Sequence, residues 1–164
     1  MNKKALKSKT DVLTKIVIAT KDIYDKASDE QKALMETLIG AGIWYLPNSM
    51  ELYSGKISQT ALDAITEKPN TKLVEEHSFP RKIAGRFLYD NAEKLKENPD
   101  YFSQKYVESF GRFNLVLKSE NDKLKRYQKL DSFKSEIESY ESAGIKLVDF
   151  SIEEYKEHKK HLRR

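Results

Sequence analysis

The chain contains no cysteine among its 164 residues. Disulfide bonds and zinc sites built from cysteine are therefore excluded, which fits a reducing compartment such as the cytoplasm. No apolar run approaches the roughly 20 residues that a membrane-spanning helix needs. The basic stretch from Met1 to Lys9 makes a poor signal peptide, because Lys15 interrupts the apolar segment that follows it. We therefore expect a cytoplasmic protein with no membrane partner.

The sequence also lacks internal repeats, low-complexity tracts and any linker long enough to separate two domains. Its length suffices for one domain with a real core, so we predict a single domain over residues 1–164. Charged residues make up 34% of the chain, which predicts much charged helix surface. The formal net charge of +4 suits a nucleic-acid partner without establishing one.

Residues 1–70 form a helical N-terminal part in this interpretation. Over residues 10–26 apolar side chains recur at the spacing of one helix, with Thr10 or Asp11 as its cap: Val12, Ile16, Ala19 and Ile23. Ser28 and Gln31 form a capping-box pattern for a second helix. That helix should reach about Ile39 and end at the Gly-Ala-Gly sequence of residues 40–42.

The segment that follows is rich in aromatic residues. Residues 43–47, Ile-Trp-Tyr-Leu-Pro, favour a buried segment, and a platform for stacking bases is the other interpretation. Residues 54–56, Ser-Gly-Lys, read as a turn. Ser58 is a natural cap for a short helix that runs to about Thr66.

The middle of the chain predicts two strands separated by helices. Leu73–His77 is the first strand, and Pro80 suits the first turn of the helical segment 81–111 that follows it. Arg112–Lys118 is the second strand, and Ser119 caps a helix with apolar positions through Leu130. Residues 131–164 continue with helical pattern to residues 143–144, a short strand at residues 145–150 and a capped, basic terminal helix.

The most informative stretch is Lys72–Lys82, which is apolar, then acidic, then carries His77 and Pro80 before turning basic. A carboxylate can hold a hard divalent cation, and a neutral imidazole can take a proton from water near neutral pH. Glu76 and His77 can therefore serve a metal and a nucleophile at one phosphate. A solvated glutamate beside a packed histidine is the alternative.

A second piece stands at the other predicted strand, where residues 114–121 read Asn-Leu-Val-Leu-Lys-Ser-Glu-Asn. Together with Glu-His-x-x-Pro at residues 76–80, it resembles the HNH (ββα-metal) endonucleases. The likeness is nearest to the HNH module of CRISPR effector nucleases, which carry Asp-His-x-x-Pro and an Asn-led strand before a Ser-Asp-x-Asn helix start. The resemblance covers residues 72–130.

The resemblance implies a mostly helical α+β fold with a ββα-metal core and helices 81–111 inserted between its strands. It assigns the acidic metal ligand to Glu76, the general base to His77 and the second metal ligand to Asn121. Asn114 matches, more loosely, the asparagine that braces the loop bearing the histidine. The ion implied is Mg²⁺ or Mn²⁺, because both ligands are oxygen donors.

Three features depart from that family pattern. His77 and Asn121 lie 44 positions apart, further than in the usual motif. Glutamate replaces aspartate, and the cysteine pairs of many members are absent. Strand alternation also places Glu75, rather than Glu76, on the face of His77, so Glu75 stays open as the acidic ligand.

Several basic residues are candidates for contacts with the DNA backbone: Arg81, Lys82, Lys123, Lys125 and Arg126. Arg81 and Lys82 directly follow the proposed site in the chain. Lys123, Lys125 and Arg126 belong to a run of charges on a predicted helix, and such a run is usually only a solvated face. His158 and His161, with Glu154 one turn earlier, could bind a metal, although a solvated basic tail is the plainer interpretation.

These patterns predict a metal-dependent DNA endonuclease of HNH type. The alternative is a non-catalytic helical protein that binds nucleic acid or another partner, in which His77 is packed and the basic helices make the contacts.

Overall fold

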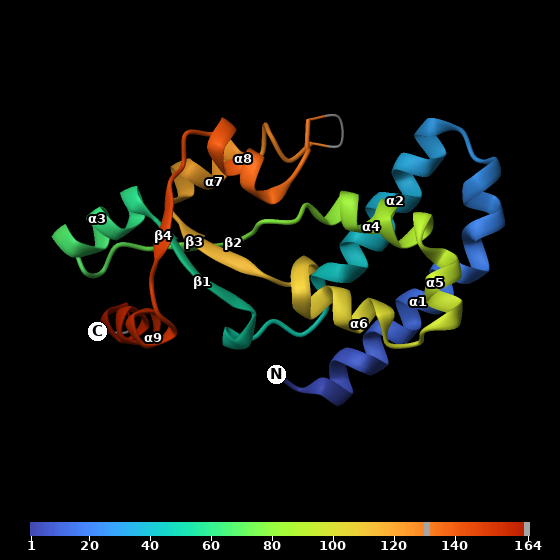
Figure 1. Cartoon of the computed structure of the whole chain (residues 1–164), viewed down its shortest axis with the longest axis horizontal. Coiled ribbons are helices and arrows are strands. Elements are labelled where there is room, and N and C mark those ends of the chain that lie inside the picture. Colours follow the sequence, from blue (N-terminus) through green and yellow to red (C-terminus); the bar gives the residue numbers. More distant parts are fainter. Residues whose placement is uncertain (130–131, 163–164) are drawn as a thin grey trace. The chain divides into compact units, whose positions relative to one another are not determined.

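A computed structural model describes residues 1–129 and 132–162 of the chain (Figure 1). The fold is α+β and mostly helical, as predicted, with a small mixed sheet. Contacts divide it into two compact units, each made of two separate stretches of chain. Unit 1 comprises residues 1–49 and 79–111, and unit 2 comprises residues 50–78 and the described residues from 112 onward. Whether the chain acts as the single domain predicted above stays a prediction.

Unit 1 is helical throughout its described elements. They are α1 (Lys3–Lys26), α2 (Asp29–Trp44), α4 (Arg81–Asp90), α5 (Ala92–Glu97), α6 (Tyr101–Lys105) and a π-helical segment (Tyr106–Phe110). The helices between the two predicted strands thus pack with α1 and α2 in one unit, and the strands themselves lie in the other.

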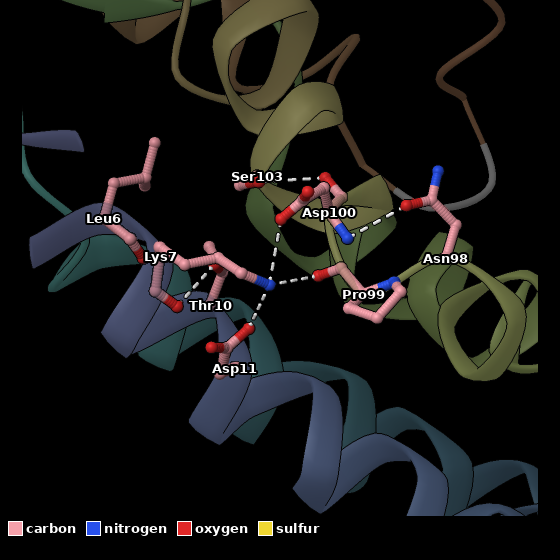
Figure 2. Close-up of polar contacts among 8 residues, drawn as sticks. All are labelled: Leu6, Lys7, Thr10, Asp11, Asn98, Pro99, Asp100 and Ser103. Carbon is pink, nitrogen blue, oxygen red and sulfur yellow. Dashed lines mark hydrogen bonds and ion pairs between the residues drawn. The ribbon is translucent and has the colours of Figure 1, made fainter. Parts of the chain in front are cut away.

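Polar contacts fix the first turns of α1 to the start of α6. Lys7 Nζ donates to Asp11 at 2.6 Å and to the carbonyl oxygen of Pro99 at 2.6 Å, and it pairs with Asp100 at 3.0 Å (Figure 2). The buried Thr10 hydroxyl donates to backbone carbonyls one turn earlier in its own helix. Helix α1 therefore begins at its cap Asn2 and runs through Thr10, which the sequence suggested as a possible start.

A buried carboxylate and two glycines organise the packing of α2 against α4. Glu36 is fully buried, and its Oε1 accepts from the Tyr24 hydroxyl at 2.8 Å and from Arg86 Nε at 2.8 Å. A Cβ on Gly85 would collide with the backbone of Glu36, and one on Gly40 would meet the Arg81 carbonyl oxygen at 2.8 Å. Only glycine permits the two helix backbones to approach this closely.

Unit 2 is built around the sheet. Its elements are a 3₁₀ turn η1 (Met50–Leu52), β1 (Tyr53–Ser58), α3 (Gln59–Glu67), β2 (Val74–His77), β3 (Phe113–Val116), α7 (Lys118–Leu124), α8 (Glu136–Ser142), β4 (Leu147–Asp149) and α9 (Ile152–His161). The strand order is β2-β3-β1-β4; β3 runs parallel to β1, and the other two neighbouring pairs are antiparallel.

Most predicted helix starts are confirmed, but several ends are not. The capping boxes at Ser28 and Ser151 and the cap at Ser58 are all present. Helix α2 continues through residues 40–42, because Gly40 serves close packing instead of termination. Helix α7 begins two residues earlier than predicted, with Leu117 rather than Ser119 at its cap position, and it ends at Leu124. The predicted Leu130 lies outside the described residues.

Two predictions about the N-terminal half are wrong. Residues 54–56 are not a turn but part of β1, where Gly55 has a φ of +82° and the register against β3 shifts. In the aromatic segment, Ile43 and Leu46 are buried as predicted, but Trp44 and Tyr45 are exposed. Trp44 instead carries the Arg81 guanidinium over its ring.

No helix within the described residues is long and apolar enough to cross a membrane.

Candidate functional site

The predicted strand pair is present in unit 2. Strands β2 and β3 run antiparallel, with His77 opposite Phe113 and Glu76 opposite Asn114. Helix α7 follows β3 directly and contacts β2. The chain therefore places an acid–histidine pair at the end of the first strand and an asparagine-bearing helix after the second, in the order that the sequence suggested.

Glu76 is buried on the face of the sheet that α7 and α8 cover. Its Oε1 accepts from Gln128 Nε2 at 2.5 Å, and its Oε2 accepts from the Tyr140 hydroxyl. Tyr140 belongs to the apolar cluster that also contains Leu124 of α7 and Val116 of β3. Helix α8 thus delivers the Tyr140 donor, and the segment that follows α7 delivers the Gln128 donor.

Asn114 extends the same network across the strand pair. Its Nδ2 donates to the Tyr140 hydroxyl at 2.9 Å, and its Oδ1 accepts from the Ser54 hydroxyl of β1. The side chain is buried and faces the side of the sheet that carries Glu76, opposite the side of His77. Asn114 therefore reaches the acid through Tyr140, on the face of the sheet opposite to the histidine that the resemblance expects it to brace.

A second carboxylate lies near Glu76. Burial raises the pKa of Glu76, the hydrogen bonds from Gln128 and Tyr140 lower it, and the negative charge of Glu136 raises it again, with a net upward shift. Glu136 opens α8, where it accepts from the Ser78 hydroxyl at 3.0 Å. Two carboxylates and a hydroxyl thus gather where β2 ends.

Glu75 and His77 occupy the other face of β2, as strand alternation predicts. Glu75 Oε1 accepts from the Tyr155 hydroxyl at 2.5 Å and from Lys159 at 2.9 Å, both on α9. The half-buried His77 ring lies edge-on to Phe113, with centroids 6.1 Å apart. The two candidate acids therefore flank the histidine from opposite faces, and Glu75 is the one that shares its face.

Asn121 lies on α7, half-buried, one turn before the buried Leu124. Its helix packs on the face that carries Glu76, so Asn121 and Glu76 belong to the same side of the sheet. The side chain of His77 leaves β2 on the opposite face of the sheet. It could approach Glu76 and Asn121 only by passing around the end of the strand.

The predicted basic contacts divide between the units. Lys123, Lys125 and Arg126 are exposed near the end of α7 in unit 2. Lys125 pairs with Asp122 at 2.6 Å, and Asp122 also pairs with Lys118, which lowers the pKa of the aspartate.

Arg81 and Lys82 belong to α4 in unit 1. Burial lowers the pKa of Arg81 to about 10, and its guanidinium stacks on Trp44. Arg81 is therefore engaged within its own unit, although it stays protonated at neutral pH.

The histidines of α9 lie beside a shallow cleft of about 380 Å³ that is lined mainly by α9 and the end of α3. His158 is buried, and burial lowers its pKa, with the neighbouring His161 contributing in the same direction. Among the described residues, no group of three or more His, Cys, Asp or Glu side chains is arranged to hold a metal ion, either on α9 or at the end of β2.

The donors at the end of β2 fit a hard divalent cation in kind. Mg²⁺ is commonly held by one or two carboxylates, with water and substrate phosphate filling its other positions. The negative charge of Glu136 contributes to the raised pKa of Glu76, and a cation beside Glu76 would favour its ionised form. Glu76 would exchange its hydrogen bonds with Tyr140 and Gln128 for such an ion.

Sequence reasoning missed the residues that surround Glu76. Gln128, Glu136 and Tyr140 lie 52 to 64 positions away from it and carry no motif. The helical pattern that runs to residues 143–144 and the capping pattern of Ser135 with Glu138 mark a helix in this region, but neither indicates what the helix packs against.

No family model matches the chain, and no curated protein and no solved structure matches it either.

Proposed function

We propose that this protein is a metal-dependent DNA endonuclease of HNH type, with its site at the end of β2 in unit 2. The observation that carries the proposal is the paired arrangement of β2 and β3 followed by α7. This arrangement supports the order of strand, strand and helix that the motif resemblance requires, although long helical segments separate β2 from β3 in the sequence.

His77 is the general base in this proposal. A phosphodiester needs an activated water, and an imidazole at the end of a strand can accept the proton of that water at neutral pH. Glu76 and Asn121 hold the cation, and Glu136 is an additional carboxylate that the fold supplies. The cation, when bound, stabilises the charge that develops on the leaving oxygen. Lys123, Lys125 and Arg126 contact the DNA backbone.

The second candidate is a non-catalytic protein that binds nucleic acid or another partner. The hydrogen bonding of Glu76 favours it, since both carboxylate oxygens already accept from buried or half-buried donors. In that case the network of Glu76, Tyr140 and Asn114 is structural, and the exposed basic residues after α7 provide the affinity.

A plasmid-nicking assay across Mg²⁺ concentrations separates these candidates. The wild-type protein should nick in the presence of Mg²⁺ and stop when EDTA is added. His77→Ala should lower the rate by roughly 10²–10⁴-fold, the usual contribution of a positioned general base, and leave DNA affinity nearly unchanged. Asn121→Ala should raise the Mg²⁺ concentration needed for half-maximal nicking, because it removes a proposed ligand.

The matched control is His161→Ala, which removes an exposed imidazole from α9 in the same unit and should cut at the wild-type rate. Circular dichroism checks that each variant is folded. A folded His77→Ala protein that nicks as fast as wild type would show that His77 is not the base. Salt-sensitive DNA binding without any nicking would establish the second candidate instead.

A further inference from the structure

The antiparallel pair of helices α1 and α2 carries an apolar face on its solvent side. Six large side chains on it are between 43% and 73% exposed: Val12, Ile16, Ile23, Leu34, Leu38 and Tyr45. A contiguous exposed apolar face of this kind is typical of an interaction surface. It lies entirely within unit 1.

Both helices present their side chains at the same spacing. Positions i, i+4, i+7 and i+11 are Val12, Ile16, Ala19 and Ile23 on α1, and Leu34, Leu38, Ala41 and Tyr45 on α2. This spacing is one stripe on each helix. The buried side chains of α1, such as Val17 and Tyr24, lie on a different face, so the stripe is not needed for the core of unit 1.

Contacts show that the two stripes adjoin. Ile23 and Leu34 line one hollow of about 500 Å³ at the turn between the helices. At the other end Lys9 Nζ donates to the carbonyl oxygen of Tyr45 at 2.6 Å, and a Leu13 methyl group lies against Gly42 between them. Extending the register of Ile23 and Leu34 along the two helices, we infer that Ile16 is level with Ala41 and Ala19 with Leu38, so that large and small residues alternate.

We propose that this α1–α2 face is the interface of a homodimer, in which α1 of one copy lies antiparallel over α2 of the other and the four helices form a bundle. A two-fold axis parallel to the α1 and α2 helix axes keeps each residue at the same height in both copies. It therefore places Ile16 of one copy over Ala41 of the other, and Ala19 over Leu38. Large side chains then meet alanines at both sites, which is the complementarity that close-packed helix layers require. An isologous contact of this kind uses the same surface twice.

Charge at the turn fits the same arrangement. The exposed Lys26 ends α1 and the exposed Glu30 opens α2, each at the margin of the face. In the proposed dimer, Lys26 of one copy faces Glu30 of the other, and the symmetry forms this contact twice. None of the eight stripe positions carries a charged residue, and the charged side chain of Lys15 lies at the margin of the face.

The size of the face predicts a weak dimer. Each stripe covers about three helical turns, or ~16 Å, and two neighbouring helices are ~20 Å wide. Such a patch covers ~320 Å² per copy, or ~640 Å² for the two copies, which is below the roughly 1,200 Å² or more that specific interfaces bury in total. We therefore expect dissociation in the micromolar range, with surrounding polar side chains completing the contact.

Sedimentation equilibrium over a concentration series tests the interface. The wild-type chain should dimerise, and Leu38→Lys should raise the dissociation constant at least about tenfold, because it places an ammonium group against apolar side chains. Ile137→Lys is the matched control, since Ile137 is an equally exposed apolar residue on α8 in unit 2. It should leave the dissociation constant unchanged.

Charge reversal tests the orientation. Lys26→Glu alone and Glu30→Lys alone should each dimerise more weakly than wild type, because like charges then meet. An equimolar mixture of the two, with one labelled with ¹⁵N, should form more heterodimer in native mass spectrometry than random pairing gives. A wild-type chain that stays monomeric well above micromolar concentration would overturn the proposal, as would a dimer that Leu38→Lys leaves intact or a mixture that pairs at random. A monomer that binds lipid vesicles through this face would assign the surface to a membrane instead.

Discussion

At the scale of single residues, Glu76 shows how the environment decides what a carboxylate can do. Its burial, and the charge of Glu136 beside it, raise its pKa more than the hydrogen bonds from Gln128 and Tyr140 lower it. A carboxyl in this state is poised either to bind a cation or to stay protonated within a structural network. Its titration is therefore informative whichever function holds.

Glu76→Gln should change how stability depends on pH. Because the folded pKa is raised, the folded chain keeps this proton to higher pH than the unfolded chain, whose glutamates titrate near ~4.3. The protonated Glu76 therefore stabilises the folded chain. This stabilisation is complete at pH values below the unfolded pKa and is lost as the pH rises through the folded pKa. The free energy of unfolding of the wild type should therefore fall relative to the Gln variant as the pH rises.

Urea unfolding at a series of pH values, without added divalent cation, measures this difference. The matched control is Glu67→Gln, at the exposed end of α3 in the same unit, for which no comparable divergence is expected. A difference between wild type and Glu76→Gln that stays constant with pH would contradict the raised pKa.

At the scale of elements, α2 and α4 depend on two glycines that face one another's backbones. Gly85→Ala would place a methyl group against the carbonyl of Glu36, which belongs to a helix backbone that cannot yield. We expect unfolding to become easier by ~1–3 kcal/mol, the usual cost of overpacking a tight contact.

The matched control is Gly42→Ala in α2. There the new methyl group meets a terminal methyl of Leu13, a flexible side chain that can rotate away, and the helix gains up to about 1 kcal/mol in propensity. Its loss of stability by denaturant unfolding should be clearly smaller than that of Gly85→Ala. Equal losses would show that the close backbone approach is not what Gly85 provides.

At the scale of the whole molecule, the chain passes between its two units three times, yet each unit has a core of its own. Leu88 is fully buried in unit 1 and Leu115 is fully buried in unit 2. Local stability follows the density of buried contacts, so damage to one core should be felt first by the amides that pack on it.

Leu88→Ala and Leu115→Ala form a reciprocal pair of variants for hydrogen–deuterium exchange. Each should cost ~2–5 kcal/mol in its own unit, as large-to-small core changes do. Leu88→Ala should speed exchange mainly in α2 and α4, and Leu115→Ala mainly in β1 and β2. Uniformly faster exchange over both units in either variant would show that the chain unfolds as one cooperative body.

The sequence by itself determined the local elements whose signals are local. The capping boxes at Ser28 and Ser151, the cap at Ser58 and strand β2 follow from short-range hydrogen bonding and alternation, and all are present. It also determined the mostly helical α+β class. The alternation that set Glu75 and Glu76 on opposite faces of β2 is of this kind, because a strand has only two faces.

The tertiary structure alone decided which partners those elements meet. The apolar stripe that includes Val12 and Ile23 predicts a helix. Its spacing does not distinguish a buried face from an exposed one, and in the structure these side chains are exposed. In the sequence Gly40 and Gly55 predict a helix end and a turn, yet Gly40 admits a neighbouring helix and Gly55 lets a strand continue at positive φ. The donors around Glu76 come from more than 50 positions away, and only tertiary packing on the sheet brings Tyr140 of α8 and Gln128, which follows α7, to it. Contacts of such sequence separation leave no periodic signal, which is why the surroundings of the proposed site could not be predicted.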